Sequence, residues 1–78
     1  MGKLVLNKRE LLLQSALGLI GIALPQEYVI RIVMLEDLAK EKGLGNITIS
    51  DGVDIERSAE REFEHRQKTV NVENNEEN

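Results

Sequence analysis

The side chains suited to acid–base or thiolate chemistry are few, and their spacing forms no catalytic set. The chain has one histidine, His65, and no cysteine. A catalytic base needs a cleft and a group that orients it, and neither a serine nor an aspartate stands at a recognisable catalytic spacing from His65. Zinc sites built from thiolates or from several histidines are excluded by the same residue counts. The sequence therefore predicts that the protein is not an enzyme and carries no cofactor.

Three acidic residues, Asp51, Asp54 and Glu56, lie close together and are the best candidates for binding a cation. Residues 40–51 have the outline of a calcium-binding EF-hand loop, but lysine and leucine occupy positions that must supply oxygen ligands. Acids at this place also cap a helix and stabilise the positive end of its dipole. We favour the capping role, so the sequence predicts no metal site, and it offers no pattern for a small-molecule substrate.

The distribution of charge argues against binding of nucleic acid. The net charge is −4, with six basic and five acidic side chains in residues 1–44 but four basic and nine acidic side chains in residues 45–78. An acidic half repels phosphate backbones, and no basic stripe compensates for it. The two aromatic residues, Tyr28 and Phe63, are too few for a base-stacking platform.

A membrane or secretory role is not expected either. The apolar run at residues 11–24 lacks the flanks and cleavage site of a secretory signal. Its fourteen residues also fall short of the roughly 20 that a membrane-spanning helix needs. A membrane-surface role for the apolar hairpin needs basic flanks, which Lys8 and Arg9 supply only weakly. We therefore expect a cytoplasmic protein that does not bind membranes.

The first predicted helix covers residues 8–21 or 8–23. It begins after Asn7, which together with Glu10 has the spacing of a capping box. A second helix is predicted over residues 25–42, since Pro25 suits a first helical turn. Glycine at positions 43 and 45 then provides two candidate stops.

The rest of the chain predicts a third helix, a tail and two short strands. The third helix should begin near residues 52–54, after a cap at Ser50 or Asp51, and end near residue 68. Residues 69–78 have little to bury, so we expect a disordered acidic tail after a helical domain over residues 1–68. Short strand candidates at residues 3–6 and 46–49 can pair as a two-stranded β-bridge.

The predicted fold class is therefore all-α: a three-helix domain in which the first two helices form a hairpin and the third packs across it. One conflict concerns residues 28–33, whose β-branched side chains also suit a strand. We favour a helix there, because Pro25 starts it well and strong helix formers continue it.

Apolar residues cover most of the first helix. Its polar or small residues fall on one narrow strip, which we predict to face water: Asn7, Glu10, Gln14, Gly18, Gly21 and Pro25. The alternative is that the glycines on this strip allow a close contact between helices. The third helix offers a single apolar row, which is too narrow to cover both of the first two helices. Some of the apolar surface within residues 11–35 should therefore need a partner.

These patterns predict a non-enzymatic protein of interaction or assembly, which associates with itself as a dimer or higher oligomer or is a small structural component of a larger complex. The predicted interface lies on the hairpin of the first two helices: Leu12, Leu13, Ala16, Leu19, Ile20, Ala23, Val29, Ile30, Val33 and Met34. The alternative is a small acidic inhibitor or regulator that binds another protein through the third helix and the acidic tail.

Overall fold

The computed structural model describes residues 5–77, with side chains described for residues 5–69. Its elements are helix α1 (Lys8–Leu19), helix α2 (Gln26–Lys42), the short 3₁₀ helix η1 (Leu44–Asn46) and helix α3 (Ile49–Glu77). The described residues contain no strand. The predicted all-α fold with three helices is confirmed.

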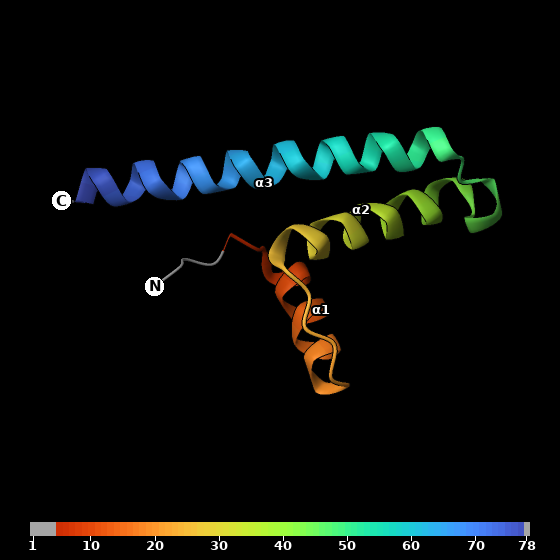
Figure 1. The fold of residues 1–78 in the computed structure, drawn as a ribbon, viewed down its shortest axis with the longest axis horizontal. Helices are drawn as coiled ribbons and strands as arrows, with labels where there is room; N and C mark the ends of the chain where they lie inside the picture. Colours follow the sequence, from red (N-terminus) through yellow and green to blue (C-terminus); the bar gives the residue numbers. More distant parts are fainter. Residues whose placement is uncertain (1–4, 78) are drawn as a thin grey trace.

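The long helices α2 and α3 lie side by side and antiparallel, while α1 projects from them at a steep angle (Figure 1). The connection between α1 and α2 runs back along α1, so residues 8–25 form a protruding unit that we call the arm. The hairpin is thus made by α2 and α3, and not by the first two helices as the sequence predicted. The radius of gyration is 14.4 Å, against roughly 11.5 Å for a compact domain of this length.

The core lies between α2 and α3. Val29 and Ile30 are completely buried, Val33 is nearly so, and Ala59 of α3 lies buried with them. The small side chain of Ala59 lets the two helices approach closely. The β-branched run at residues 28–33 is helical, as predicted, because burial against α3 outweighs its intrinsic preference for strand.

The first two helices begin and end at the signals in the sequence, with small shifts. The capping box is present, with Asn7 accepting from the Glu10 amide at 2.9 Å and Glu10 accepting from the Asn7 amide at 2.9 Å. Helix α1 ends at Leu19, earlier than predicted, and Gly21 turns the chain with a φ of 85°. Pro25 precedes α2 as its cap, and Gly43 ends α2 with a φ of 89°.

Helix α3 begins earlier than predicted. Thr48 and Asp51 form a second capping box, in which the Asp51 amide donates to the Thr48 hydroxyl at 3.1 Å and the Thr48 amide donates to Asp51 at 2.9 Å. The helix also continues to Glu77, past residue 68, since no glycine or proline interrupts this segment. The side chains of residues 70–78 lie outside the described part, so the division into a domain and an acidic tail stays a prediction.

The β-bridge between residues 3–6 and 46–49 is not present in the part of the chain that is described. The backbone oxygen of Val5 accepts from Arg66 of α3 at 3.2 Å. Arg66 is 17 residues beyond Ile49 in the same helix, which places the two about 25 Å apart along its axis. Residues 5 and 6 therefore lie far from 46–49, and residues 3 and 4 lie outside the described residues.

Candidate interaction surface

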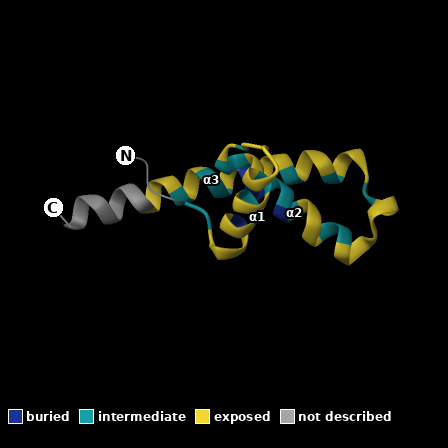
Figure 2. Cartoon of the chain, turned by 90° about the horizontal axis from the view of Figure 1, so that it is seen from below, coloured by how far each residue is buried: buried dark blue, intermediate teal, exposed yellow. Residues whose placement is uncertain are grey.

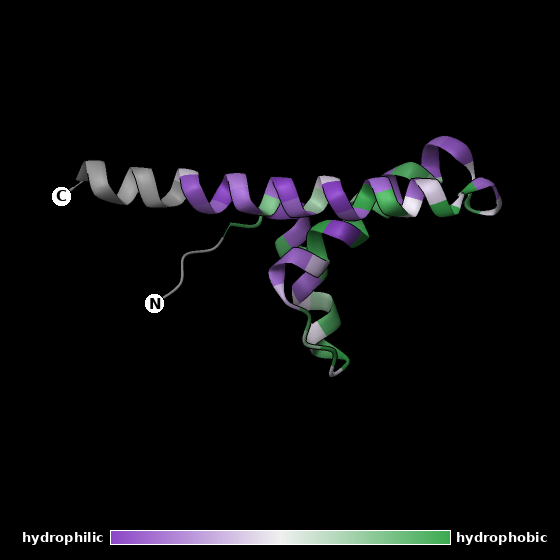
Figure 3. Ribbon diagram, turned by 45° about the horizontal axis from the view of Figure 1, so that its top comes forward, coloured by the Kyte–Doolittle hydropathy of each residue, from purple (hydrophilic) through white to green (hydrophobic). Residues whose placement is uncertain are grey.

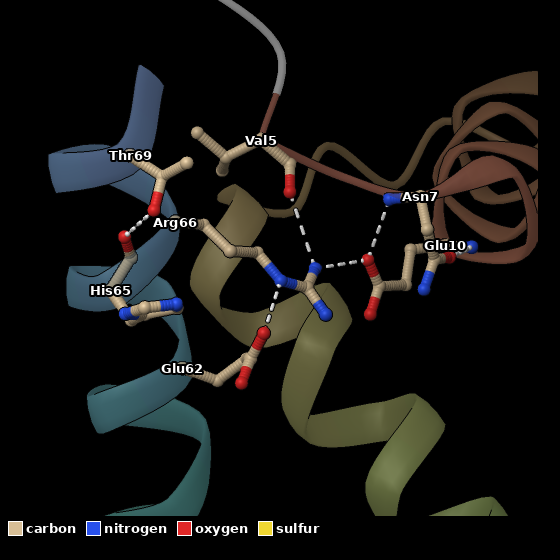
Figure 4. A network of polar contacts seen from close by, with 7 residues as sticks. All are labelled: Val5, Asn7, Glu10, Glu62, His65, Arg66 and Thr69. Atoms are coloured by element: carbon tan, nitrogen blue, oxygen red, sulfur yellow. Dashed lines mark hydrogen bonds and ion pairs between the residues drawn. The ribbon is translucent and has the colours of Figure 1, made fainter. Parts of the chain in front are cut away.

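The base of the arm is fixed to α3 by a buried ion pair. Nη1 of Arg66 lies 2.5 Å from a carboxylate oxygen of Glu10, whose side chain is only 4% exposed. The same guanidinium donates to Glu62 at 2.7 Å and to the Val5 backbone oxygen (Figure 4). Hydrogen bonds to Glu10 and then to Glu62 raise the pKa of Arg66 above its usual value. These contacts hold the N-terminus of α1 against the second half of α3.

Two further contacts set the direction of the arm. Arg9 donates to Asp37 of α2 at 2.8 Å and also pairs with Glu36. The hydrogen bonds that Arg9 donates, first to Asp37 and then to Glu36, raise the pKa of Arg9, and the bond from the Arg9 guanidinium lowers the pKa of Glu36. Further along the helix, Nε2 of Gln14 donates to the backbone oxygen of Leu24 at 3.0 Å. That bond keeps the returning connection alongside α1.

The polar strip on α1 faces water only in part: Asn7, Gly18, Gly21 and Pro25 are exposed, as predicted, but Glu10 and Gln14 are not. Glu10 is buried at the ion pair, and Gln14 is half-buried beneath the connection. Polar residues on this strip therefore make the contacts within the molecule. A close helix contact at the glycines is not found among the described residues, because a Cβ added at Gly18 or Gly21 would meet nothing within 4 Å.

The apolar face of α1 is turned to solvent instead. Leu12 is 63% exposed and Leu19 is 88% exposed. Figure 2 shows most of the arm as exposed, and Figure 3 shows that its outer half is mostly hydrophobic while the coloured part of α3 beyond α1 is mostly hydrophilic. The large apolar residues exposed on the arm are Leu11, Leu12, Leu19, Ile20 and Ile22.

The ten residues of the predicted interface divide between the surface and the core. Those that reach solvent lie on the arm: Leu12, Ala16, Leu19, Ile20 and Ala23. Leu13 and Met34 are half-buried. Val29, Ile30 and Val33 belong to the core between α2 and α3. The part of the predicted interface that is open to a partner is therefore the arm.

A second group of exposed apolar residues was not found from the sequence. Leu44, Ile49 and Val53 lie around the turn between α2 and α3, at the end of the molecule away from the chain termini. A short apolar run such as residues 47–49 can be a strand, a loop or a helix start. Its hydrophobic periodicity therefore does not predict which of its side chains are exposed.

An open groove runs between α2 and α3 near this turn. Its apolar lining comes from Met34, Leu38 and Ile55, and its rim carries Asp37, Glu41, Asp51 and Asp54. Two of these acids are paired within the chain, Asp37 with Arg9 and Asp51 with Lys42. The candidate cation ligands Asp51 and Asp54 thus line the groove, whereas Glu56 lies 4.0 Å from Arg31.

The other candidates for chemistry stand apart from one another. His65 is exposed on α3, and its backbone oxygen accepts from the Thr69 hydroxyl at 3.0 Å. Within the part of the chain that is described, no three histidine or acidic side chains are grouped closely enough to hold a metal ion. The same residues include no helix with both the length and the apolar character to cross a bilayer. Comparison of the chain with models of protein families, curated proteins and solved structures finds no match.

Proposed function

We propose that this is a non-enzymatic assembly protein of the cytoplasm whose contact surface is the apolar arm. The observation that carries the proposal is the exposure of Leu12 and Leu19 on a helix whose polar residues are used for contacts within the chain. A helix with its apolar face in water is typical of a surface that another protein covers. We take the partner to be a second copy of the chain, and a component of a larger complex is the alternative.

The amount of exposed surface supports association. The chain exposes 5895 Å², and a compact monomer of 8.8 kDa exposes roughly 4,800 Å². The chain is therefore more open than a compact monomer of the same mass. Both the arm and the second half of α3 protrude and contribute to this exposed surface.

Light scattering of the purified chain over a dilution series tests the proposal. The average mass of the wild-type chain should exceed that of a monomer at high concentration and fall on dilution. Leu19→Asp should remain monomeric, because it would bury a charge in the apolar contact. Ile49→Asp is the matched control, since Ile49 is 90% exposed and Leu19 is 88% exposed, and it should behave as the wild-type chain does. A wild-type chain that is monomeric at every concentration would contradict the proposal.

A second candidate function is an acidic regulator that binds a protein through α3 and the acidic segment at residues 69–78. The observation in its favour is a row of exposed carboxylates at Glu56, Glu60 and Glu64, on the helix that extends beyond the rest of the molecule. Replacement of all three by lysine should then abolish function while self-association stays unchanged. If the same replacement leaves function intact, the regulator hypothesis is wrong.

A further inference from the structure

The exposed face of α1 has a self-complementary pattern. Leu12, Ser15, Ala16 and Leu19 have the spacing i, i+3, i+4 and i+7. The two middle residues are small, and the two outer residues are large. At 100° per residue these four positions span about 100° of the helix, and all four are exposed. Small residues between two large ones let a second helix approach closely.

We propose that this stripe, residues 12–19, pairs with the same stripe of a second copy in an antiparallel, two-fold symmetric contact. The axis passes between Ser15 and Ala16, so that Leu12 of each copy lies against Leu19 of the other. A two-fold contact must be self-complementary in this way, because each residue pair occurs twice. The inference rests on the proposed function and names the partner that covers the arm.

The charges along the chain favour the antiparallel direction. Lys8 and Arg9 stand at the start of α1, and the next charged residue after Glu10 is Glu27, so residues 11–26 carry no charge. Arg9 is paired with Glu36 and Asp37, so the charge that matters is that of Lys8. A parallel pair would bring the two Lys8 side chains together, whereas an antiparallel pair places them at opposite ends. The helix dipoles also attract each other in the antiparallel arrangement. The one hydroxyl in the stripe, on Ser15, can donate to a carbonyl of its own helix.

Cysteine cross-linking tests the pairing, because the natural chain has no cysteine to interfere. In the antiparallel register, position 12 faces position 19 of the second copy. Two copies of position 12 are separated by seven residues, about 10.5 Å along the helix, which exceeds the roughly 7 Å limit for Cα atoms in a disulfide. A mixture of Leu12→Cys and Leu19→Cys chains under mild oxidation should therefore form a covalent dimer that neither variant forms alone.

The mixture should give about tenfold more covalent dimer than either variant by itself, since a complex holds the two thiols at a high effective concentration. Ser50→Cys, exposed at the start of α3, measures the background from random collisions. Equal cross-linking by Leu12→Cys alone would overturn the antiparallel register. Background cross-linking in all mixtures, with dimers still seen by light scattering, would overturn the inference but leave the proposed function standing. A chain that is monomeric by light scattering overturns both.

Discussion

The ion pair between Glu10 and Arg66 offers a direct measure of how firmly the arm is held to α3. The substitution Arg66→Met removes the cation but leaves the Glu10 carboxylate buried, with the Asn7 amide as its remaining hydrogen-bond donor. Loss of one partner of a fully buried pair costs about 3–5 kcal/mol. Arg66 is itself 22% exposed, so water can partly solvate the stranded carboxylate, and we expect a loss of about 2–3 kcal/mol.

Thermal unfolding followed by far-ultraviolet circular dichroism, at one fixed protein concentration, measures this loss. A domain of this length has a total stability of about 4–12 kcal/mol, and each kcal/mol shifts its midpoint by about 4–8 °C. The midpoint of Arg66→Met should therefore fall by about 10–20 °C. Arg61→Met is the matched control, since Arg61 is exposed on the same helix, and it should change stability by at most about 0.5 kcal/mol. Equal effects of the two substitutions would refute the reasoning.

Two further predictions concern the turn between α2 and α3. Gly43→Ala should lower the free energy of unfolding, measured by urea titration, by about 1–3 kcal/mol. The reason is that Gly43 has a φ of +89° and a Cβ there would lie 3.2 Å from Nδ2 of Asn46. The control Gly45→Ala, with open space around it, should be neutral or stabilising in the same titration. A hydrogen bond from Lys42 holds the pKa of Asp51 below its usual value, so its stabilising effect is present above about pH 4 and is lost as the pH falls through the lowered pKa. Asp51→Asn should then be less stable than the wild-type chain at neutral pH, and the two urea midpoints should converge in acid.

Local signals in the sequence predicted the helices well, because each depends on residues that are neighbours in the chain. The capping box of Asn7 and Glu10, and the stop at Gly43, appear where the sequence placed them. The start of α3 was predicted late, although Thr48 and Asp51 have the spacing of a capping box with aspartate in place of glutamate. This capping signal therefore lies about one turn before the start predicted at residues 52–54.

The packing of the helices was not predictable in the same way. The widths of the apolar faces predicted that one helix would keep part of its apolar surface in water. They did not predict which two helices would pack against each other. The choice of α3 as the partner of α2 depends on contacts between distant parts of the chain, where Val29, Ile30 and Val33 of α2 and Ala59 of α3 are buried. Similarly, Glu10 was expected to face water with the polar strip, because its partner Arg66 is 56 residues away. A buried charge is explained only when its partner is known.

A final prediction concerns the exposed arm. We expect burial of its apolar side chains in a dimer to offset the free-energy cost of association only by a small margin. The exposed fractions of its five large apolar side chains amount to about three whole side chains, worth about 4–9 kcal/mol per arm if fully covered. Part of this free energy offsets the cost of association, which is about 4–15 kcal/mol. We expect a dissociation constant between about millimolar and micromolar.

Stability should therefore depend on concentration in this range. A tenfold rise in concentration favours a dimer over unfolded chains by about 1.4 kcal/mol per dimer, which raises the thermal midpoint by about 3–5 °C. Leu19→Asp should unfold at the same temperature at every concentration, because it has no dimer to stabilise. If the wild-type midpoint also stays constant over about a hundredfold range of concentration, the arm remains in water, and the surface of α1 is not what holds copies of this protein together.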